Sequence, residues 1–160
     1  MNTTRSSASA WVGRSEVPTL SQNQWAVLAI PGAILVVMVI LQIVSFGKFK
    51  DWLDEIKIGA PAAVAVVLII AELWGALSLF KVPMNAMFRY VGLWLAVLVS
   101  GFWLVENLYL VSGWTAGQLS NSGYFGNYLT QSPGWWTAIE ATIMLFWVIY
   151  AAELISRTKA

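Results

Sequence analysis

Three glutamates, Glu72, Glu106 and Glu140, lie inside long apolar runs of this chain. None of these runs contains a Lys or Arg that could neutralise them. An ionised carboxylate surrounded by hydrocarbon costs at least a few kcal/mol. Each glutamate is therefore expected to be protonated, to be hydrogen-bonded within a helix bundle, or to face a cavity filled by water or a ligand.

Two interpretations of these carboxyls stay open. In the first, Glu106, Asn107 and Glu140 form the mouth of an outward-opening polar pocket, with Glu72 deeper and Gln42 as a further polar partner. Such a pocket would carry protons or hold a polar or cationic ligand. In the second, the glutamates are protonated and donate hydrogen bonds between helices, each worth roughly 1 kcal/mol, without any turnover.

Helical periodicity favours convergence of the three carboxyls on the bundle interior. At 100° per residue, Glu106 shares an arc with the small residues Gly92, Ala96 and Ser100. Glu106 and Glu140 each lie five residues from the outer end of a span, so they are expected at similar depth and could meet.

The chain contains no Cys and no His. Thiol chemistry, iron–sulfur clusters, His-ligated haem and zinc sites are therefore excluded, and no metal or haem ligand set is expected. A bound quinone or lipid stays open as a cofactor. A net charge of +1 gives no reason to expect a nucleic acid partner.

Four apolar stretches each have about the 20 residues that are needed to cross a bilayer. With 59% hydrophobic and 11% charged residues, the chain is too apolar for a soluble domain of 160 residues. Backbone groups in lipid must bond within their own segment, so the stretches are predicted to be α-helices. The sequence therefore predicts an all-α, polytopic membrane protein with a four-transmembrane-helix bundle. The expected spans are 25–46, 60–80, 91–111 and 135–155, within a transmembrane domain of residues 25–156 that follows a polar N-terminal segment (1–24) and precedes a short tail (157–160).

Prolines mark the expected helix starts. Pro31 and Pro61 are placed in first turns, and Ser132 followed by Pro133 is interpreted as an N-cap and first helical residue.

The distribution of Lys and Arg predicts that both termini are cytoplasmic in a cell (inner or plasma) membrane. The third loop, residues 112–134, carries no charge, as expected of a translocated segment. Lys81 and Arg89 are interpreted as anchors on the cytoplasmic side. The basic residues on the expected inner side are Arg5, Arg14, Lys81, Arg89, Arg157 and Lys159, against Lys48, Lys50 and Lys57 outside.

In residues 48–58 the apolar side chains recur at helical spacing, so that one side of a helix would carry Phe49, Trp52, Leu53 and Ile56 and the other the charged residues. The pattern predicts a short amphipathic interfacial helix that lies flat on the outer membrane surface. The alternative is a short solvated turn.

Two short motifs resemble those of the DoxX-like and MauE-like family of four-helix membrane proteins. Gly47 and Lys50 occupy the two fixed places of a G-x-x-K motif after the first span, and Glu72 to Gly75 match an E-L-x-G pattern. The resemblance covers roughly residues 28–112 and, more weakly, the last span. It implies association with membrane redox systems, including a terminal quinol oxidase complex and a thiol-oxidoreductase context. The uncharged third loop and the long polar N-terminus depart from the family pattern.

The leading functional expectation is a non-catalytic or accessory subunit of a larger membrane complex, linked to redox or quinone chemistry. Its partners would be other membrane protein subunits, in a hetero-complex or a homodimer, and membrane lipids. The alternative is a small proton-coupled carrier or exporter that uses the intramembrane glutamates. An autonomous enzyme is least favoured, because the sequence shows no nucleophile arrangement, metal site or nucleotide cradle.

Overall fold

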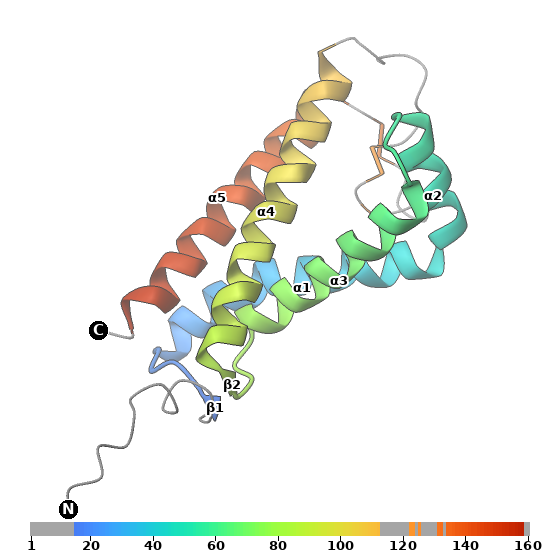
Figure 1. The fold of residues 1–160 in the computed structure, drawn as a ribbon. Helices are drawn as coiled ribbons and strands as arrows, with labels where there is room; N and C mark the ends of the chain where they lie inside the picture. The colour runs from blue at the N-terminus through green and yellow to red at the C-terminus, as the bar shows by residue number, and fades with distance from the viewer. Residues whose placement is uncertain (1–14, 113–121, 124, 126–130, 133, 159–160) are drawn as a thin grey trace, which may run out of the picture.

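Five helices and one minimal strand pair make up the computed structural model, which describes residues 15–112, 122–123, 125, 131–132 and 134–158 (Figure 1). The strands are β1 (Ser15–Glu16) and β2 (Met84–Asn85), paired antiparallel. The helices are α1 (Gln22–Val44), α2 (Phe46–Glu55), α3 (Pro61–Leu79), α4 (Ala86–Val111) and α5 (Trp135–Arg157).

Four of these helices, α1, α3, α4 and α5, are long and apolar enough to cross a membrane, and they pack as a bundle. This confirms the predicted all-α, multi-pass fold. α3 packs between α1 and α4, and α4 packs against α5, whereas α1 and α5 pack less closely than these pairs. α4 begins at Ala86, five residues before the start of the predicted span at about residue 91.

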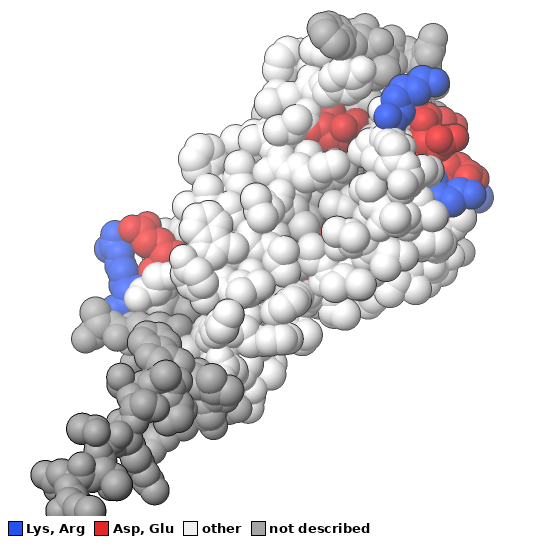
Figure 2. Space-filling view, viewed as in Figure 1, with Lys and Arg blue, Asp and Glu red and all other residues white. Residues whose placement is uncertain are grey.

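The two ends of the bundle differ in what they carry. β1, β2 and the last turn of α5 lie at one end, and α2 lies at the other (Figure 1). Figure 2 shows most of the described charged side chains on this face at the two ends, with an almost wholly uncharged surface between them. Residues 1–14 of the predicted N-terminal segment (1–24), residues 159–160 of the predicted tail (157–160) and most of the loop 112–134 lie outside the described residues.

Small residues bring α3 and α4 into close contact. A Cβ atom added to Gly75 would lie 2.9 Å from the Cβ of Ala96, and one added to Gly92 would lie 1.9 Å from Ser78 Oγ. A larger side chain at either glycine would therefore separate the helices, as expected of small-residue contacts in membrane bundles.

Arg89 is buried, with 1% of its side chain exposed. Its guanidinium donates to the carbonyl oxygens of Ser78 (2.8 Å), Phe80 (3.1 Å) and Val82. These oxygens are at and just beyond the carboxyl end of α3, where a cation both caps unpaired carbonyls and complements the helix dipole. The interpretation of Arg89 as a membrane anchor was therefore wrong, because α4 starts early and carries this side chain back onto α3.

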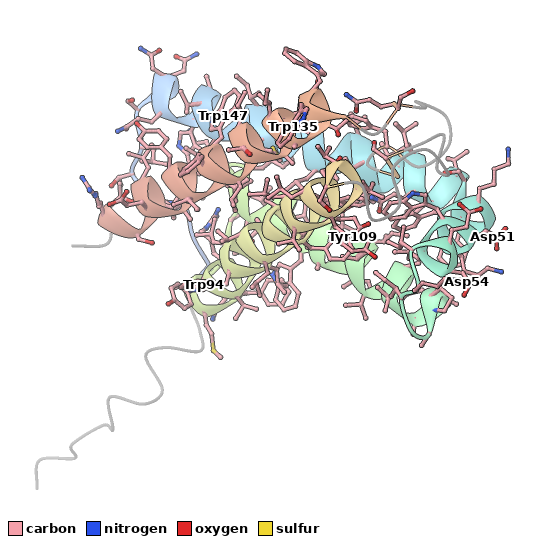
Figure 3. All side chains as sticks on the ribbon, turned by 90° about the horizontal axis from the view of Figure 1, so that it is seen from above. Asp51, Asp54, Trp94, Tyr109, Trp135 and Trp147 are labelled. Carbon is pink, nitrogen blue, oxygen red and sulfur yellow. The ribbon has the colours of Figure 1, made fainter. Side chains whose placement is uncertain are left out.

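α2 confirms the amphipathic helix, which begins at Phe46, and the alternative of a solvated turn was wrong. Phe49, Trp52 and Leu53 are at most 6% exposed, because they pack against the bundle. The apolar face of α2 therefore contacts protein, and its place at the outer membrane surface stays a prediction. Asp51 and Asp54 point away from the bundle (Figure 3).

α5 begins at Trp135, with Gly134 as its N-cap. The Thr137 hydroxyl accepts from the Gly134 N–H (3.3 Å) and donates to the Gly134 carbonyl (2.7 Å). The N-cap expected at Ser132 was therefore wrong, and Pro133 lies outside the described residues.

Pro61 starts α3 as predicted, but Pro31 lies inside α1 and not in its first turn. Proline has no backbone N–H, so the carbonyl of Val27, one turn earlier, has no partner within the helix. The indole N–H of Trp147 in α5 donates to this carbonyl at 3.1 Å. Trp147 lies where α5 faces α1 (Figure 3). An interhelical bond thus replaces the one that the proline removes.

We expect Trp147→Phe to lower the free energy of unfolding by about 1 to 2 kcal/mol, because it leaves the Val27 carbonyl unpaired. In a Pro31→Ala background the new N–H pairs this carbonyl, so the same substitution should cost about half as much or less. Titration with SDS in mixed micelles, followed by circular dichroism, measures both. Trp135→Phe, at a side chain that is 70% exposed, is the control. Equal costs in the two backgrounds would contradict the replacement bond.

Candidate functional site

A buried polar cluster joins three of the four spanning helices. One carboxyl oxygen of Glu72 in α3, Oε1, accepts from the amide Nε2 of Gln42 in α1 at 3.2 Å and from the indole Nε1 of Trp103 in α4 at 2.8 Å. All three side chains are 0% exposed. We call Gln42, Glu72 and Trp103 the Glu72 cluster. It provides the interhelical hydrogen bonding that was expected of a glutamate in this position.

Two oxygens of the Glu72 cluster, Glu72 Oε2 and Gln42 Oε1, are buried and make no hydrogen bond within the described residues. If Glu72 is ionised, both oxygens can only accept hydrogen bonds, and neither has a donor. The cluster would then also hold an uncompensated negative charge. A proton on Glu72 supplies a donor where the cluster has two unfilled acceptors. The arrangement therefore suits a neutral carboxylic acid that cross-links helices.

Aromatic rings close the Glu72 cluster on the side of α2. The Trp103 ring stacks with those of Trp52 (centroids 5.7 Å apart) and Phe49 (6.3 Å). Gly123 packs against the ring of Trp52, because a Cβ there would lie 2.4 Å from the ring. Its φ of +74° is also one that glycine adopts without strain. α2 and this part of the third loop thus seal the cluster.

Sequence reasoning missed Trp103 as the second donor to Glu72. Trp103 lies eight residues before the end of α4, away from the interfacial level at which indole rings usually gather. A Trp in the middle of a span, on the same arc as small residues, was the signal that could have identified it.

Asn107 lies one turn beyond Trp103 and is 0% exposed. Its Nδ2 donates to the Trp103 carbonyl at 2.7 Å, and its Oδ1 has no partner among the described residues. The prediction that Asn107 stands at the mouth of an open pocket was therefore wrong, because the residue is enclosed on the buried face of α4.

Glu106 is half-buried, and its Oε1 is enclosed without a hydrogen-bond partner in the described part of the chain. Helical geometry rotates it by about 100° from Asn107, so it leaves the innermost arc of α4. No hydrogen bond joins Glu106 to Glu140 within that part.

Glu140 lies in a cavity between α1 and α5. Its Oε2 accepts from the Nε2 of Gln131 at 2.6 Å. The cavity has a volume of about 780 Å³, and we call it the α1–α5 groove. Its lining residues are Ile30, Ala33, Ile34, Val37, Phe125, Gln131, Glu140, Ile143, Met144 and Trp147.

The structure therefore does not gather the three carboxyls around one opening. Glu72 is sealed in the core with Gln42, Glu106 is half-buried on α4, and Glu140 faces the α1–α5 groove. Periodicity identified an inward arc on each helix, but it could not determine which neighbouring helix each arc would face.

The four motif residues fall into two groups. Glu72 and Gly75 are buried in α3, at the cluster and at the contact with Ala96. Gly47 and Lys50 lie on α2, where a Cβ added to Gly47 would meet nothing within 4 Å. Lys50 is partly exposed and pairs with Asp51 at 3.1 Å. The motifs therefore do not form a single site.

No group of three His, Cys, Asp or Glu side chains that could hold a metal ion occurs among the residues that the structure describes.

We expect Glu72→Leu to destabilise the bundle by roughly 2 to 4 kcal/mol, since it leaves two buried donors, on Gln42 and Trp103, unpaired. Glu72→Gln keeps an acceptor oxygen and adds donors, so it should cost about 1 kcal/mol or less. SDS titration in mixed micelles tests both. Glu106→Leu, which removes no hydrogen bond among the described residues, is the matched control. Equal stability of the Leu and Gln variants at position 72 would contradict the cross-link.

No protein-family model matches the chain, and no curated protein or solved structure matches it. The likeness to DoxX-like proteins therefore stands on the motif residues of the sequence alone.

Proposed function

We propose that the chain is a non-catalytic, DoxX-like subunit or accessory protein of a larger membrane complex. The observation that carries the proposal is the Glu72 cluster. Its carboxyl is fully buried, accepts from Gln42 and Trp103, and is covered by α2. A fully buried carboxyl thus serves to assemble helices, which supports a role in binding other subunits more than one in turnover.

The outer surface of α2 supports contact with another subunit. No packing among the described residues requires a glycine at position 47, because nothing lies within 4 Å of a Cβ added there. The ion pair of Lys50 with Asp51 lies between exposed side chains, and such pairs contribute little to stability. A small residue and a cation one turn apart on an open face suit a partner that approaches closely and carries negative charge.

Large apolar side chains on the spanning helices support contact with lipid or with apolar partner helices. Val67, Leu98 and Phe146 are each more than 60% exposed. In water such side chains would form an unfavourable surface, whereas in a bilayer they are solvated by acyl chains.

The link to redox or quinone chemistry rests on the resemblance of Gly47, Lys50, Glu72 and Gly75 to the family motifs. We place both termini in the cytoplasm of a cell (inner or plasma) membrane. Removing the buried Arg89 from the six inner basic residues leaves five, against three on the α2 side, so the bias is kept.

The chain, purified from its native membrane in a mild detergent, should migrate with other membrane subunits and with quinone-linked oxidoreductase activity. Gly47→Leu should release these subunits, because it fills the open face of α2. Gly59→Leu, at another glycine with open space, should not. Native mass spectrometry identifies the subunits that stay bound to each variant, and an activity assay of the eluate measures the associated oxidoreductase. A lone, monodisperse chain without activity would contradict the proposal.

A small proton-coupled carrier is the second candidate, favoured by the place of Glu140 in the α1–α5 groove. A carrier would dissipate a pH gradient across proteoliposomes when a transported cation is added. Glu140→Gln should then slow proton movement more than Glu106→Gln does. If Glu72→Gln, Glu106→Gln and Glu140→Gln all left the flux unchanged across a panel of organic cations, the carrier would be ruled out.

A further inference from the structure

The α1–α5 groove has the size of a small-molecule site. Its volume of about 780 Å³ falls within the range of roughly 300–1,000 Å³ that is usual for ligand pockets. One wall comes from α1 and the opposite wall from α5, with Phe125 and Gln131 of the third loop also lining it. An occupant would therefore lie between two helices that otherwise pack loosely.

The lining of the groove is apolar except for Gln131 and Glu140. Trp147 adds no polar group, because its indole N–H is already bonded to the Val27 carbonyl. That bond fixes the ring, which lines the groove together with Phe125. The groove thus combines an apolar and aromatic body with one acidic group.

Glu140 makes no ion pair within the described residues, where the two ion pairs join Lys50 to Asp51 and Arg157 to Glu153. Its Oε2 is held by Gln131 Nε2 at 2.6 Å, which orients the carboxyl. Its Oε1 has no hydrogen-bond partner in the same part of the chain. An oriented carboxyl beside aromatic rings attracts a cation through both charge and cation–π interaction.

We propose that the α1–α5 groove binds an amphiphilic organic cation, whose apolar body lies between α1 and α5 and whose charge meets Glu140. A neutral lipophile would fill the apolar part but leave the carboxyl unmatched. An anionic lipid headgroup would be repelled by it. The lining residues that carry the proposal all belong to one chain, so it does not depend on the accessory role proposed above.

Tetraphenylphosphonium is a suitable probe, with tetraphenylborate as a control of similar size and opposite charge. Equilibrium dialysis against the full chain in a non-ionic detergent should show saturable binding of the phosphonium and weaker binding of the borate. Glu140→Gln should raise the Kd for the phosphonium by about tenfold or more, since it removes the charge and keeps the bond to Gln131. Glu106→Gln, outside the groove, should leave the Kd unchanged.

Ala33→Trp tests the site from the α1 side. Ala33 is an exposed residue that lines the groove, so a large ring there occupies the space without altering Glu140. It should abolish binding even if Glu140→Gln fails to fold. An equal Kd for phosphonium and borate, or one that neither Glu140→Gln nor Ala33→Trp changes, would overturn the proposal and leave the groove a surface for acyl chains.

Discussion

One carboxyl deep in the bundle sets the constraint on which the rest of the fold depends. Glu72 lies in an apolar span with no cation in that span, so its oxygens must find donors on other helices. Gln42 and Trp103 both donate to one of these oxygens, Oε1, at 3.2 and 2.8 Å, and in doing so they fix α1 and α4 against α3. Membrane helices gain little from excluding water, so a shared polar group and close backbone contact are what select one arrangement. The close backbone contact is made by Gly75 with Ala96, one turn from Glu72.

The covering of this cluster explains the otherwise unusual composition of α2. The amphipathicity of a short helix that has Phe49 and Trp52 beside five charged residues would, taken alone, predict a membrane-surface element. Its aromatic residues instead stack on Trp103, the same side chain that donates to Glu72. Gly123 packs on Trp52 in turn. The hydrogen-bonded core, α2 and Gly123 of the third loop are therefore linked through two indole rings.

Much of the fold could be predicted from the sequence, because span length and hydropathy depend on local composition. The four spans and the amphipathic helix follow from such local signals. The partners of polar side chains depend on how helices rotate and tilt against one another, which a single sequence does not encode locally. Asn107 was therefore expected at an open mouth but is enclosed, and Arg89 was expected at the membrane surface but caps α3. Only Glu72 and Gln42 among the expected pocket residues are brought together.

Buried polar groups need hydrogen-bond partners, and this requirement explains both the contact between α1 and α5 and the groove beside it. Pro31 removes a backbone donor in α1, and Trp147 restores it from α5, so these helices are joined at that level by a bond between side chain and backbone. Beyond this bond the two helices diverge enough to leave the α1–α5 groove, with Glu140 on its wall. In the core, one oxygen of Glu72 accepts from two neighbouring helices, whereas Glu140 accepts from Gln131 alone among the described residues. The difference between an acid used for assembly and one available to a ligand is therefore the number of donors that the surrounding helices supply.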